Sequence, residues 1–262
     1  MTTDRIITRR DGAVGYLTFN NPERHNAMSL EMWRDGATAI REFCDAGDVR
    51  VVVLTGAGEK AFVAGADISR FGEERNSADA VAEYGAAVAD FQQTLTVAPM
   101  PTIAKIGGYA IGGGLAIALC CDIRIASDDS RFAVPAAKLG LGYAASGIER
   151  LMQIVGPSFA MEIFYTARQF DAAEALTMGL VNRVVPRAEL SSYCDDYIAR
   201  IAGNAPLTIK AVKTAVQENL KAPSDRDTAL CEAQVAACFA SQDYIEGRTA
   251  FAEKRKPVFT GT

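Results

Sequence analysis

Three successive glycines at positions 112–114 lie within an uncharged apolar run, GYAIGGGLAIAL, at residues 108–119. Glycine tolerates φ > 0 and lets other backbone approach closely, and the first turn of a helix leaves up to four N–H groups without intrahelical partners. Such donors, with the positive end of the helix dipole, can stabilise a developing oxyanion. The glycines alone favour a tight strand-to-helix turn. The GxGxxG and GxxxxGK spacings of nucleotide-binding loops do not occur in this run.

A second segment of small residues, AFVAGADI, occupies positions 61–68 after an apolar strand pattern. Ala64, Gly65 and Ala66 would let an extended backbone offer N–H groups to a ligand. Taken by itself, this segment predicts no more than a turn.

The elements that must position these segments repeat a strand, loop and helix pattern. Asp11-Gly12 favours a β-hairpin between residues 6–10 and 14–19. VRVVVLTG is a short, continuously apolar strand, and its lack of alternation predicts burial on both faces of a sheet; TIAKIGG and CDIRIAS are expected to be a second and a third buried strand. Ser29 can cap a helix, and a second helical face runs from Val81 to Leu95. Glycine-rich turns where strands lead into helices indicate an α/β fold.

The C-terminal part of the chain is dominated by helical patterns. They begin at about Pro157, are interrupted by GLVNRVV, and continue almost unbroken from Asn204 to Lys256. The tail carries more apolar surface than a lone helical extension could expose. We therefore expect a core at residues 1–200 and a C-terminal helical region at residues 201–262, packed on the core or on a neighbouring subunit.

Composition excludes several classes of function. With 49% hydrophobic and 23% charged residues among 262, the chain has the composition of an ordinary globular protein. A net charge of −5 leaves no basic stripe for a nucleic acid. The N-terminus lacks the apolar core of a signal peptide, and no run of about eighteen apolar residues occurs, so we expect a cytoplasmic protein with no membrane partner. The spacing of the six cysteines predicts reduced core thiols, and the single histidine, His25, excludes a His-rich metal site.

Five segments, in this order and spacing, resemble one family over nearly the whole chain. They are NNPERHNAMSLEM, AFVAGADI, KIGGYAIGGGLAIALCCDIRIAS, DAAEALTMGLVNRVV and AFAEKRKPVF, and they are similar to motifs of the enoyl-CoA hydratase/isomerase (crotonase) superfamily. The resemblance implies an α/β fold, namely a crotonase-like spiral of repeated ββα units with a C-terminal helical trimerisation region. It also implies a homotrimer or a hexamer made from two trimers.

The same resemblance assigns roles to individual residues. It implies that the backbone N–H groups of Ala66 and Gly113 hold the carbonyl of an acyl-CoA thioester while it becomes an enolate. Coenzyme A enters as part of the substrate, and no tightly bound cofactor or metal is expected. The residues implied to lie along the coenzyme A moiety are Arg24, Ala27, Ala64, Asp67 and Ile68. Phe251 and Lys254 match positions that reach the coenzyme A of an adjacent subunit, and the alternative is a solvated helix with a cationic face.

The chain departs from the hydratase pattern at two positions. Hydratases of the family carry two glutamates that bind one water and pass its proton to the α-carbon, and the matching residues here are Ala116 and Ala136. A methyl group transfers no proton, and each general acid–base step contributes roughly 10²–10⁴ in rate. Efficient hydration by that route is therefore not expected, and isomerases that retain one of these glutamates are disfavoured by the same substitution.

Tyr143 is the remaining candidate for proton transfer. It matches a catalytic aspartate of naphthoate synthases and a tyrosine of a bacterial methylmalonyl-CoA decarboxylase, whose C-terminal end this chain also resembles, although the histidine of that enzyme is replaced by Ala66. A phenol with a pKa near 10 donates a proton but is a poor base. This suits decarboxylation, because loss of CO₂ forms the enolate without a base. The alternative, which the sequence favours equally, is that Tyr143 only lines the acyl pocket.

Three functions therefore remain open. They are an acyl-CoA enzyme that stabilises an enolate, a malonyl-type acyl-CoA decarboxylase that uses Tyr143 as proton donor, and a non-catalytic acyl-CoA-binding subunit. Glu149 and Asp122 are expected to be paired structurally. His25 is expected near the phosphates of coenzyme A and far from the reacting carbon.

Overall fold

The computed structural model describes residues 5–74 and 76–262. The chain begins with the expected hairpin, in which β1 (Ile6–Asp11) pairs antiparallel with β2 (Val14–Phe19). A short 3₁₀ turn, η1 (Pro22–Arg24), precedes α1 (Leu30–Asp45). The expected cap of α1 is confirmed, because the Ser29 hydroxyl accepts a hydrogen bond from the Met32 N–H at 3.3 Å.

Three ββα units follow, each with two strands and then a helix. The first consists of β3 (Val51–Gly56), β4 (Ala61–Val63) and α3 (Ala78–Val97), with η2 (Ile68–Arg70) and α2 (Phe71–Glu74) before α3. The second consists of β5 (Thr102–Ile106), β6 (Tyr109–Ile111) and α4 (Gly113–Cys120). The third consists of β7 (Ile123–Ser127), β8 (Arg131–Ala133), η3 (Pro135–Leu139) and α5 (Ala145–Thr166). The repeated ββα pattern expected from the sequence is therefore confirmed.

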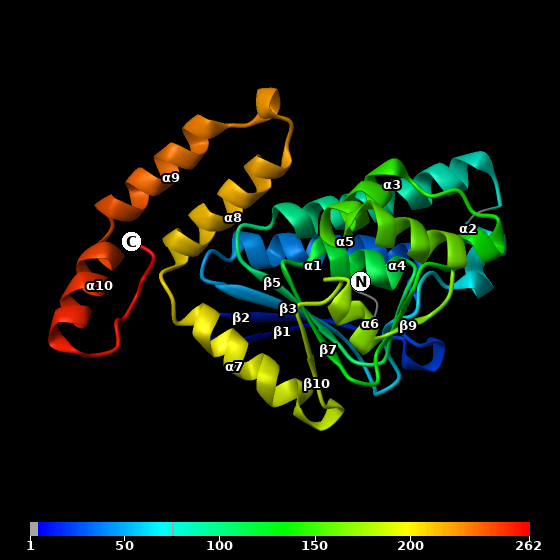
Figure 1. Cartoon of the computed structure of the whole chain (residues 1–262), viewed down its shortest axis with the longest axis horizontal. Coiled ribbons are helices and arrows are strands. Elements are labelled where there is room, and N and C mark those ends of the chain that lie inside the picture. Colours follow the sequence, from blue (N-terminus) through cyan, green and yellow to red (C-terminus); the bar gives the residue numbers. More distant parts are fainter. Residues whose placement is uncertain (1–4, 75) are drawn as a thin grey trace.

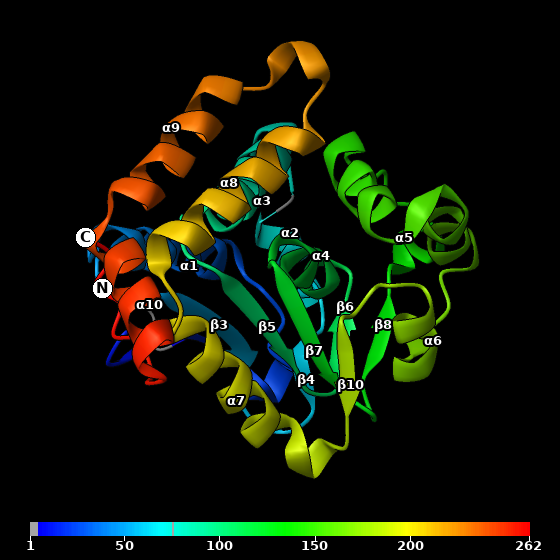
Figure 2. The same ribbon diagram turned by 60° about the vertical axis from the view of Figure 1, so that its left-hand side comes forward.

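The two strands of each unit belong to different sheets. The first strands lie in a six-stranded sheet of order β1-β2-β3-β5-β7-β10, and the second strands lie in a four-stranded sheet of order β4-β6-β8-β9. The remaining elements of this region are β9 (Phe170–Asp171), α6 (Ala172–Thr177), β10 (Arg183–Val185), η4 (Arg187–Glu189) and α7 (Leu190–Ala202). β1–β2 and β8–β9 pair antiparallel and the other neighbours pair parallel. The chain thus winds as an α/β spiral (Figures 1 and 2).

The central strands of the larger sheet are buried on both faces. Along β3, Val52 and Leu54 share the main core with residues of α1, α3 and α4. Val51 and Val53 belong to a second core on the opposite face, together with Leu190 of α7. Because every residue of this run packs against one layer or the other, the strand shows no polar alternation.

Helix α5 starts earlier than the sequence pattern suggested. It begins at Ala145 and is interrupted at Gly156, which has φ +76 directly before Pro157. Proline is well suited to the first turn of a helix, where its missing N–H needs no acceptor. Pro157 therefore starts the second half of a broken helix.

The C-terminal helices α8 (Pro206–Leu220), α9 (Thr228–Ala240) and α10 (Gln242–Glu253), with η5 (Pro223–Asp225) between α8 and α9, form an arm beside the spiral. In both views α9 lies outside α8, away from the sheets (Figures 1 and 2). Lys213 of α8 donates to the Met100 carbonyl at 2.9 Å, and Gln217 donates to the Thr96 carbonyl at 2.5 Å. Among the helices of the described residues, none is long and apolar enough to cross a bilayer.

Candidate active site

A cavity of about 320 Å³ lies where the loop after β4, helix α3, the start of α4 and residues 134–147 meet. It brings together Ala66, Gly113 and Tyr143, three residues that lie far apart in the sequence. Ala116 and Ala136 also line it. Among the described residues that line this cavity, none has a side chain of Lys, Arg, His, Asp or Glu. The site therefore offers neutral hydrogen-bonding groups in an apolar setting.

The three glycines before and within α4 differ in conformation and in what a side chain would meet. Gly112 has φ +53 and ψ −113, a conformation that L side chains avoid. A Cβ on Gly113 would lie 3.3 Å from Cζ2 of Trp33. A Cβ on Gly114 would overlap the carbonyl oxygen of Val63. Gly114 thus lets α4 pack directly on β4, which brings the first turn of α4 to the cavity.

Ala66 and Gly113 each have a backbone N–H with no acceptor within residues 5–74 and 76–262. The Met28 N–H donates to the Gly65 carbonyl at 2.8 Å, and the Asp67 N–H donates to the Met28 carbonyl at 2.9 Å. This bridge pairs the neighbours of Ala66 and leaves its own amide available. Gly113 is the first residue of α4, so its amide has no intrahelical partner.

The peptide group that carries the Ala66 N–H lies against the start of α4. A Cβ on Gly113 would be 3.9 Å from the carbonyl carbon of Gly65, the atom bonded to the Ala66 nitrogen. Gly65 itself has φ +97, and a Cβ there would be 3.3 Å from the Ile111 carbonyl oxygen. The two amides therefore belong to neighbouring backbone segments of one cavity wall, as two donors to a single oxygen atom require.

Tyr143 lines the same cavity, and packing holds its ring. The ring meets Phe164 edge-on, with centroids 4.9 Å apart, and a Cβ on Gly147 would lie 2.7 Å from Cε1 of Tyr143. Burial, with a smaller contribution from Cys120, raises the pKa of the Tyr143 phenol to about 12. Its hydroxyl has no hydrogen-bond partner in the described part of the chain. Tyr143 is thus a neutral group that can donate a proton but is a poor base near pH 7.

Two residues of the cavity wall, Trp33 and Gln92, were missed as site residues in the sequence. Tyr84, Val88 and Gln92 follow one another at intervals of four on α3, and all three line the cavity. Gln92 interrupts an otherwise apolar helical face, which is a signal that the sequence contained. Trp33 comes from α1, and its position on the amphipathic face of that helix predicted only core packing.

The residues expected along coenzyme A, apart from Phe251 and Lys254, lie on two segments, the one before α1 and the one after β4, which a backbone hydrogen bond joins. The Ala64 N–H donates to the His25 carbonyl at 3.0 Å, which places the segment of Arg24 and Ala27 beside the loop after β4. Ala64 and Ile68 line the cavity, and Ile68 is 61% exposed. Arg24 is exposed and Ala27 is buried.

Asp67 has a structural task within the same loop. Its carboxylate accepts hydrogen bonds from the Ser69 N–H at 3.1 Å and from the Ser69 hydroxyl at 2.6 Å. The side chain is therefore bonded to its own loop, in the manner of an Asx turn.

Phe251 and Lys254 do not line this cavity. Phe251 lies on α10 and is 88% exposed, and Lys254 ends that helix in a left-handed conformation with φ +57. Within one chain these residues belong to the C-terminal arm.

The remaining titratable candidates lie outside the cavity. Asp122 is paired structurally, as expected, because it accepts from the Thr102 N–H at 2.7 Å and from Lys213 at 2.8 Å. Glu149 is exposed and accepts from Gln153 at 3.5 Å. His25 is exposed, with its ring edge-on to Tyr109. The six cysteines, all in the described part, are free thiols, and the described residues contain no group of three or more His, Cys, Asp or Glu suited to a metal ion.

Known proteins are similar to this chain in sequence and in architecture. Residues 9–262 match the family model of enoyl-CoA hydratase/isomerase. The chain is 36% identical over 256 residues to a short-chain-enoyl-CoA hydratase of Clostridium acetobutylicum, with 98% of this chain and 97% of that protein covered. It is 34% identical over 263 residues to carnitinyl-CoA dehydratase of Escherichia coli, with 99% of each covered. A crystal structure of an enoyl-CoA hydratase/carnithine racemase from Magnetospirillum magneticum superimposes with a TM-score of 0.91 at 37% identity, covering 99% of this chain and 97% of that one.

Proposed function

Because the chain belongs to the enoyl-CoA hydratase/isomerase family, we propose that it acts on acyl-CoA thioesters by stabilising an enolate with the Ala66 and Gly113 amides. One observation carries this proposal. Ala66 and Gly113 line one cavity, and their N–H groups have no acceptor within the part of the chain that the structure describes.

In this reaction the thioester carbonyl oxygen accepts a hydrogen bond from each amide. When a bond to the α-carbon breaks and leaves its electron pair on that carbon, the pair moves towards the carbonyl, negative charge grows on the oxygen, and the fixed N–H dipoles stabilise it without rearranging. The N-terminal end of α4 adds the positive end of its dipole. The substrate supplies the charge, so an uncharged apolar wall suits the site.

The proton donor to the α-carbon distinguishes the possible reactions. Ala116 and Ala136, which the resemblance matches to the two glutamates of hydratases, place methyl groups in the cavity, so we do not propose hydration by two glutamates. Tyr143 is the proton donor that we propose, since its phenol is neutral and lines the cavity. After it protonates the α-carbon, the phenolate regains a proton from solvent.

A malonyl-type decarboxylation is the second candidate, favoured by the uncharged cavity wall. A carboxylate in an apolar site without a cation loses its hydration, which destabilises the charged group. Breaking the carbon–carbon bond to that carboxylate releases CO₂ and leaves the electron pair on the enolate. Tyr143 would then protonate the enolate carbon, and no base is needed.

The coenzyme A moiety is proposed to extend from the cavity over the two joined loops. Arg24 is an exposed cation that can pair with a phosphate there, and Ala64 and Ile68 line the way out of the cavity. Ala27 and Asp67 are proposed to contribute mainly by shaping these loops, since both are buried.

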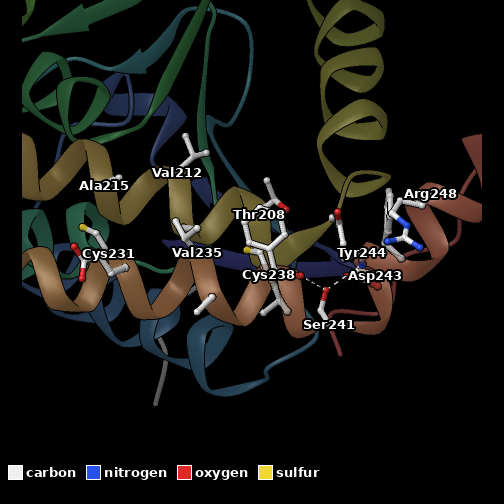
Figure 3. A pocket seen from close by; sticks show the side chains of 18 of the residues that line it. Thr208, Val212, Ala215, Cys231, Val235, Cys238, Ser241, Asp243, Tyr244 and Arg248 are labelled. Atoms are coloured by element: carbon white, nitrogen blue, oxygen red, sulfur yellow. Dashed lines mark hydrogen bonds between the residues drawn. The ribbon is translucent and has the colours of Figure 1, made fainter.

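A homotrimer, alone or paired into a hexamer, completes the proposal. An open groove of about 1160 Å³ lies between α8, α9 and α10, and apolar side chains such as Val212 and Val235 line it (Figure 3). Every residue of α9 is at least partly exposed. Apolar surface of this extent marks protein–protein contacts. We propose that residues 201–262 oligomerise here and carry Phe251 and Lys254 to the coenzyme A of a neighbouring subunit.

A screen of CoA thioesters with a mass-spectrometric readout tests the reaction. A product formed by the wild-type protein and lost in Ala66→Pro, which removes one amide donor, is the expected result. If thioesters bind but none is converted, the protein is the non-catalytic binding subunit instead. Light scattering tests the assembly, with three or six times the chain mass of 27.9 kDa expected and a monomer contradicting it.

A further inference from the structure

We propose that Tyr84 is a positioning residue that, with Trp33, fixes the two amide donors relative to each other. This inference rests on the proposed function and adds to it a structural link between the Ala66 and Gly113 amides, which together form the oxyanion hole. The connection starts from one buried hydroxyl group on α3.

The Tyr84 hydroxyl joins two elements on either side of it. It accepts a hydrogen bond from Nε1 of Trp33 at 2.9 Å and donates one to the carbonyl oxygen of Met28 at 3.3 Å. All three residues are buried, with Tyr84 only 4% exposed. In a buried setting, losing this hydroxyl would leave the indole N–H without its acceptor.

The Met28 end of this connection holds Ala66. Met28 bonds through its N–H to the Gly65 carbonyl and through its carbonyl to the Asp67 N–H. These bonds lie on both sides of Ala66 and set the plane of the peptide that carries its amide. The Met28 N–H therefore holds the peptide that carries the Ala66 amide, and the Met28 carbonyl, which Tyr84 holds, secures the next peptide, between Ala66 and Asp67.

The Trp33 end supports Gly113. A Cβ on Gly113 would lie 3.3 Å from Cζ2 and 3.6 Å from Cη2 of the indole, so the ring forms the wall directly beside this glycine. The indole is also held edge-on by Phe91, with ring centroids 5.3 Å apart. Its N–H bond to Tyr84 fixes the remaining freedom of the ring.

The Tyr84 hydroxyl thus links the Trp33 ring, which packs beside Gly113, to Met28, whose hydrogen bonds lie on both sides of Ala66. Two amides stabilise one oxygen only when both lie within about 2.7–3.1 Å of the position that the oxyanion occupies. A connection between their supports keeps that distance the same for both. Trp33 and Tyr84 also line the cavity, so the connection runs along its wall.

Tyr84→Phe tests the inference, because it removes the hydroxyl and keeps the ring. The readout is the infrared stretch of the ¹³C-labelled carbonyl of bound butyryl-CoA, which hydrogen bonds lower in frequency. In the wild-type protein we expect a stretch below that of the free thioester, and in Tyr84→Phe we expect at least half of this shift to be lost. Tyr197→Phe is the matched control on α7, on the other face of the large sheet, and should keep the wild-type shift.

Calorimetry separates positioning from general loosening of the fold. We expect Tyr84→Phe to bind butyryl-CoA about tenfold more weakly, the effect of one net hydrogen bond, while free coenzyme A binds as in the wild type. Equal weakening for both ligands would overturn the positioning role. If Tyr84→Phe keeps the carbonyl shift of the wild type, the positioning role of Tyr84 is overturned and the proposed function stands. If the wild-type protein itself shows no carbonyl shift, the proposed function is overturned.

A second variant covers the case in which Tyr84→Phe does not fold. Trp33 is the only tryptophan of the chain, so biosynthetic incorporation of β-(3-benzothienyl)alanine replaces that indole N–H alone with sulfur. The same partial loss of the carbonyl shift is expected. An unchanged shift in this protein would contradict the inference independently.

Discussion

The side-chain amide of Asn26 donates a hydrogen bond to the carbonyl oxygen of Ala61, at 2.8 Å, and so ties the loop before α1 to the start of β4. The same Nδ2 donates to the Ala57 carbonyl at 2.9 Å, and its Oδ1 accepts from the Asn21 N–H at 3.0 Å. Asn26 is fully buried and has φ +58, a conformation that asparagine tolerates better than most residues.

Asn26→Asp keeps the shape of this side chain and removes both donors. The carbonyls of Ala57 and Ala61 then lose their partner and face a carboxylate, so we expect the free energy of unfolding to fall by roughly 1–3 kcal/mol. Denaturant titration measures the change. Arg24→Gln, on the same loop but exposed, should unfold as the wild type does, and an Asn26→Asp protein of undiminished stability would contradict the assigned role.

Replacing either of two helical glycines by alanine is expected to have opposite effects on the stability of the protein. Gly114→Ala places a methyl group on the Val63 carbonyl oxygen, and overpacking of this kind costs roughly 1–3 kcal/mol. Gly85→Ala on α3 meets nothing within 4 Å, so better helix propensity should stabilise the protein by about 0.5–1 kcal/mol. Thermal and denaturant unfolding should therefore change in opposite directions. A Gly114→Ala protein as stable as the wild type would contradict the packing of α4 on β4.

Ala66→Pro deletes the first amide donor without removing a hydrogen bond within the described chain. We expect turnover of whichever thioester the protein accepts to fall by about 10²–10³. Ala66→Gly retains the N–H and is the matched control, expected to keep most of the activity. Steady-state kinetics with both variants provide the measurement, and equal losses would mean that the Ala66 amide is not a donor to the substrate.

Tyr143→Phe removes the proposed proton donor. If the phenol protonates the enolate, turnover should fall by about 10²–10⁴. Because the pKa of Tyr143 is raised to about 12, the wild-type donor stays protonated through pH 10, so the tyrosine-dependent rate should not decline between pH 6 and pH 10. A decline centred near pH 7 or 8 would assign the proton to another group.

The raised pKa of Tyr143 also affects stability. The folded protein binds this proton more tightly than the unfolded chain, so the contribution is fully present below pH 10 and is lost as the pH rises towards about 12. The unfolding free energy of the wild type should therefore fall relative to that of Tyr143→Phe over that interval. A difference that stays constant from pH 9 to pH 12 would contradict burial of the phenol.

Replacing both cavity alanines by glutamate tests why hydration is not proposed. Ala116→Glu/Ala136→Glu would introduce two carboxylates that can bind a water and transfer protons, each step contributing roughly 10²–10⁴ in rate. We expect a measurable loss of enoyl absorbance from crotonyl-CoA in this variant. Ala116→Gln/Ala136→Gln is the control of similar size and should remain inactive. Efficient hydration by the wild-type protein would overturn the interpretation of the two alanines.

Much of the fold could be predicted from short stretches of sequence. Asp11-Gly12 predicted the hairpin and Ser29 predicted the start of α1, because turn conformation and helix capping depend on a few adjacent residues. The start of α5 was less clear, because residues 139–147 adopt a conformation set by contacts with the cavity wall. Gly147 illustrates the point, since its missing Cβ is explained only by the ring of Tyr143 beside it.

The candidate site was predictable only in part. The family resemblance implied that Ala66 and Gly113 are donors, whereas each glycine-bearing segment alone predicted a turn. Nothing in the spacing of Trp33 and Tyr84 indicated that their side chains meet, because α1 and α3 are brought together by the core and not by the chain.

The sequence by itself determined the order of elements, the absence of carboxylates at positions 116 and 136, and the places where backbone can approach closely, since all three depend on residue type and local conformation. The tertiary structure decided that Ala66, Gly113 and Tyr143 line one cavity, and that the Tyr84 hydroxyl hydrogen bonds to both Trp33 and Met28. The physical reason is that packing between distant elements brings these groups together, and no local pattern encodes that distance.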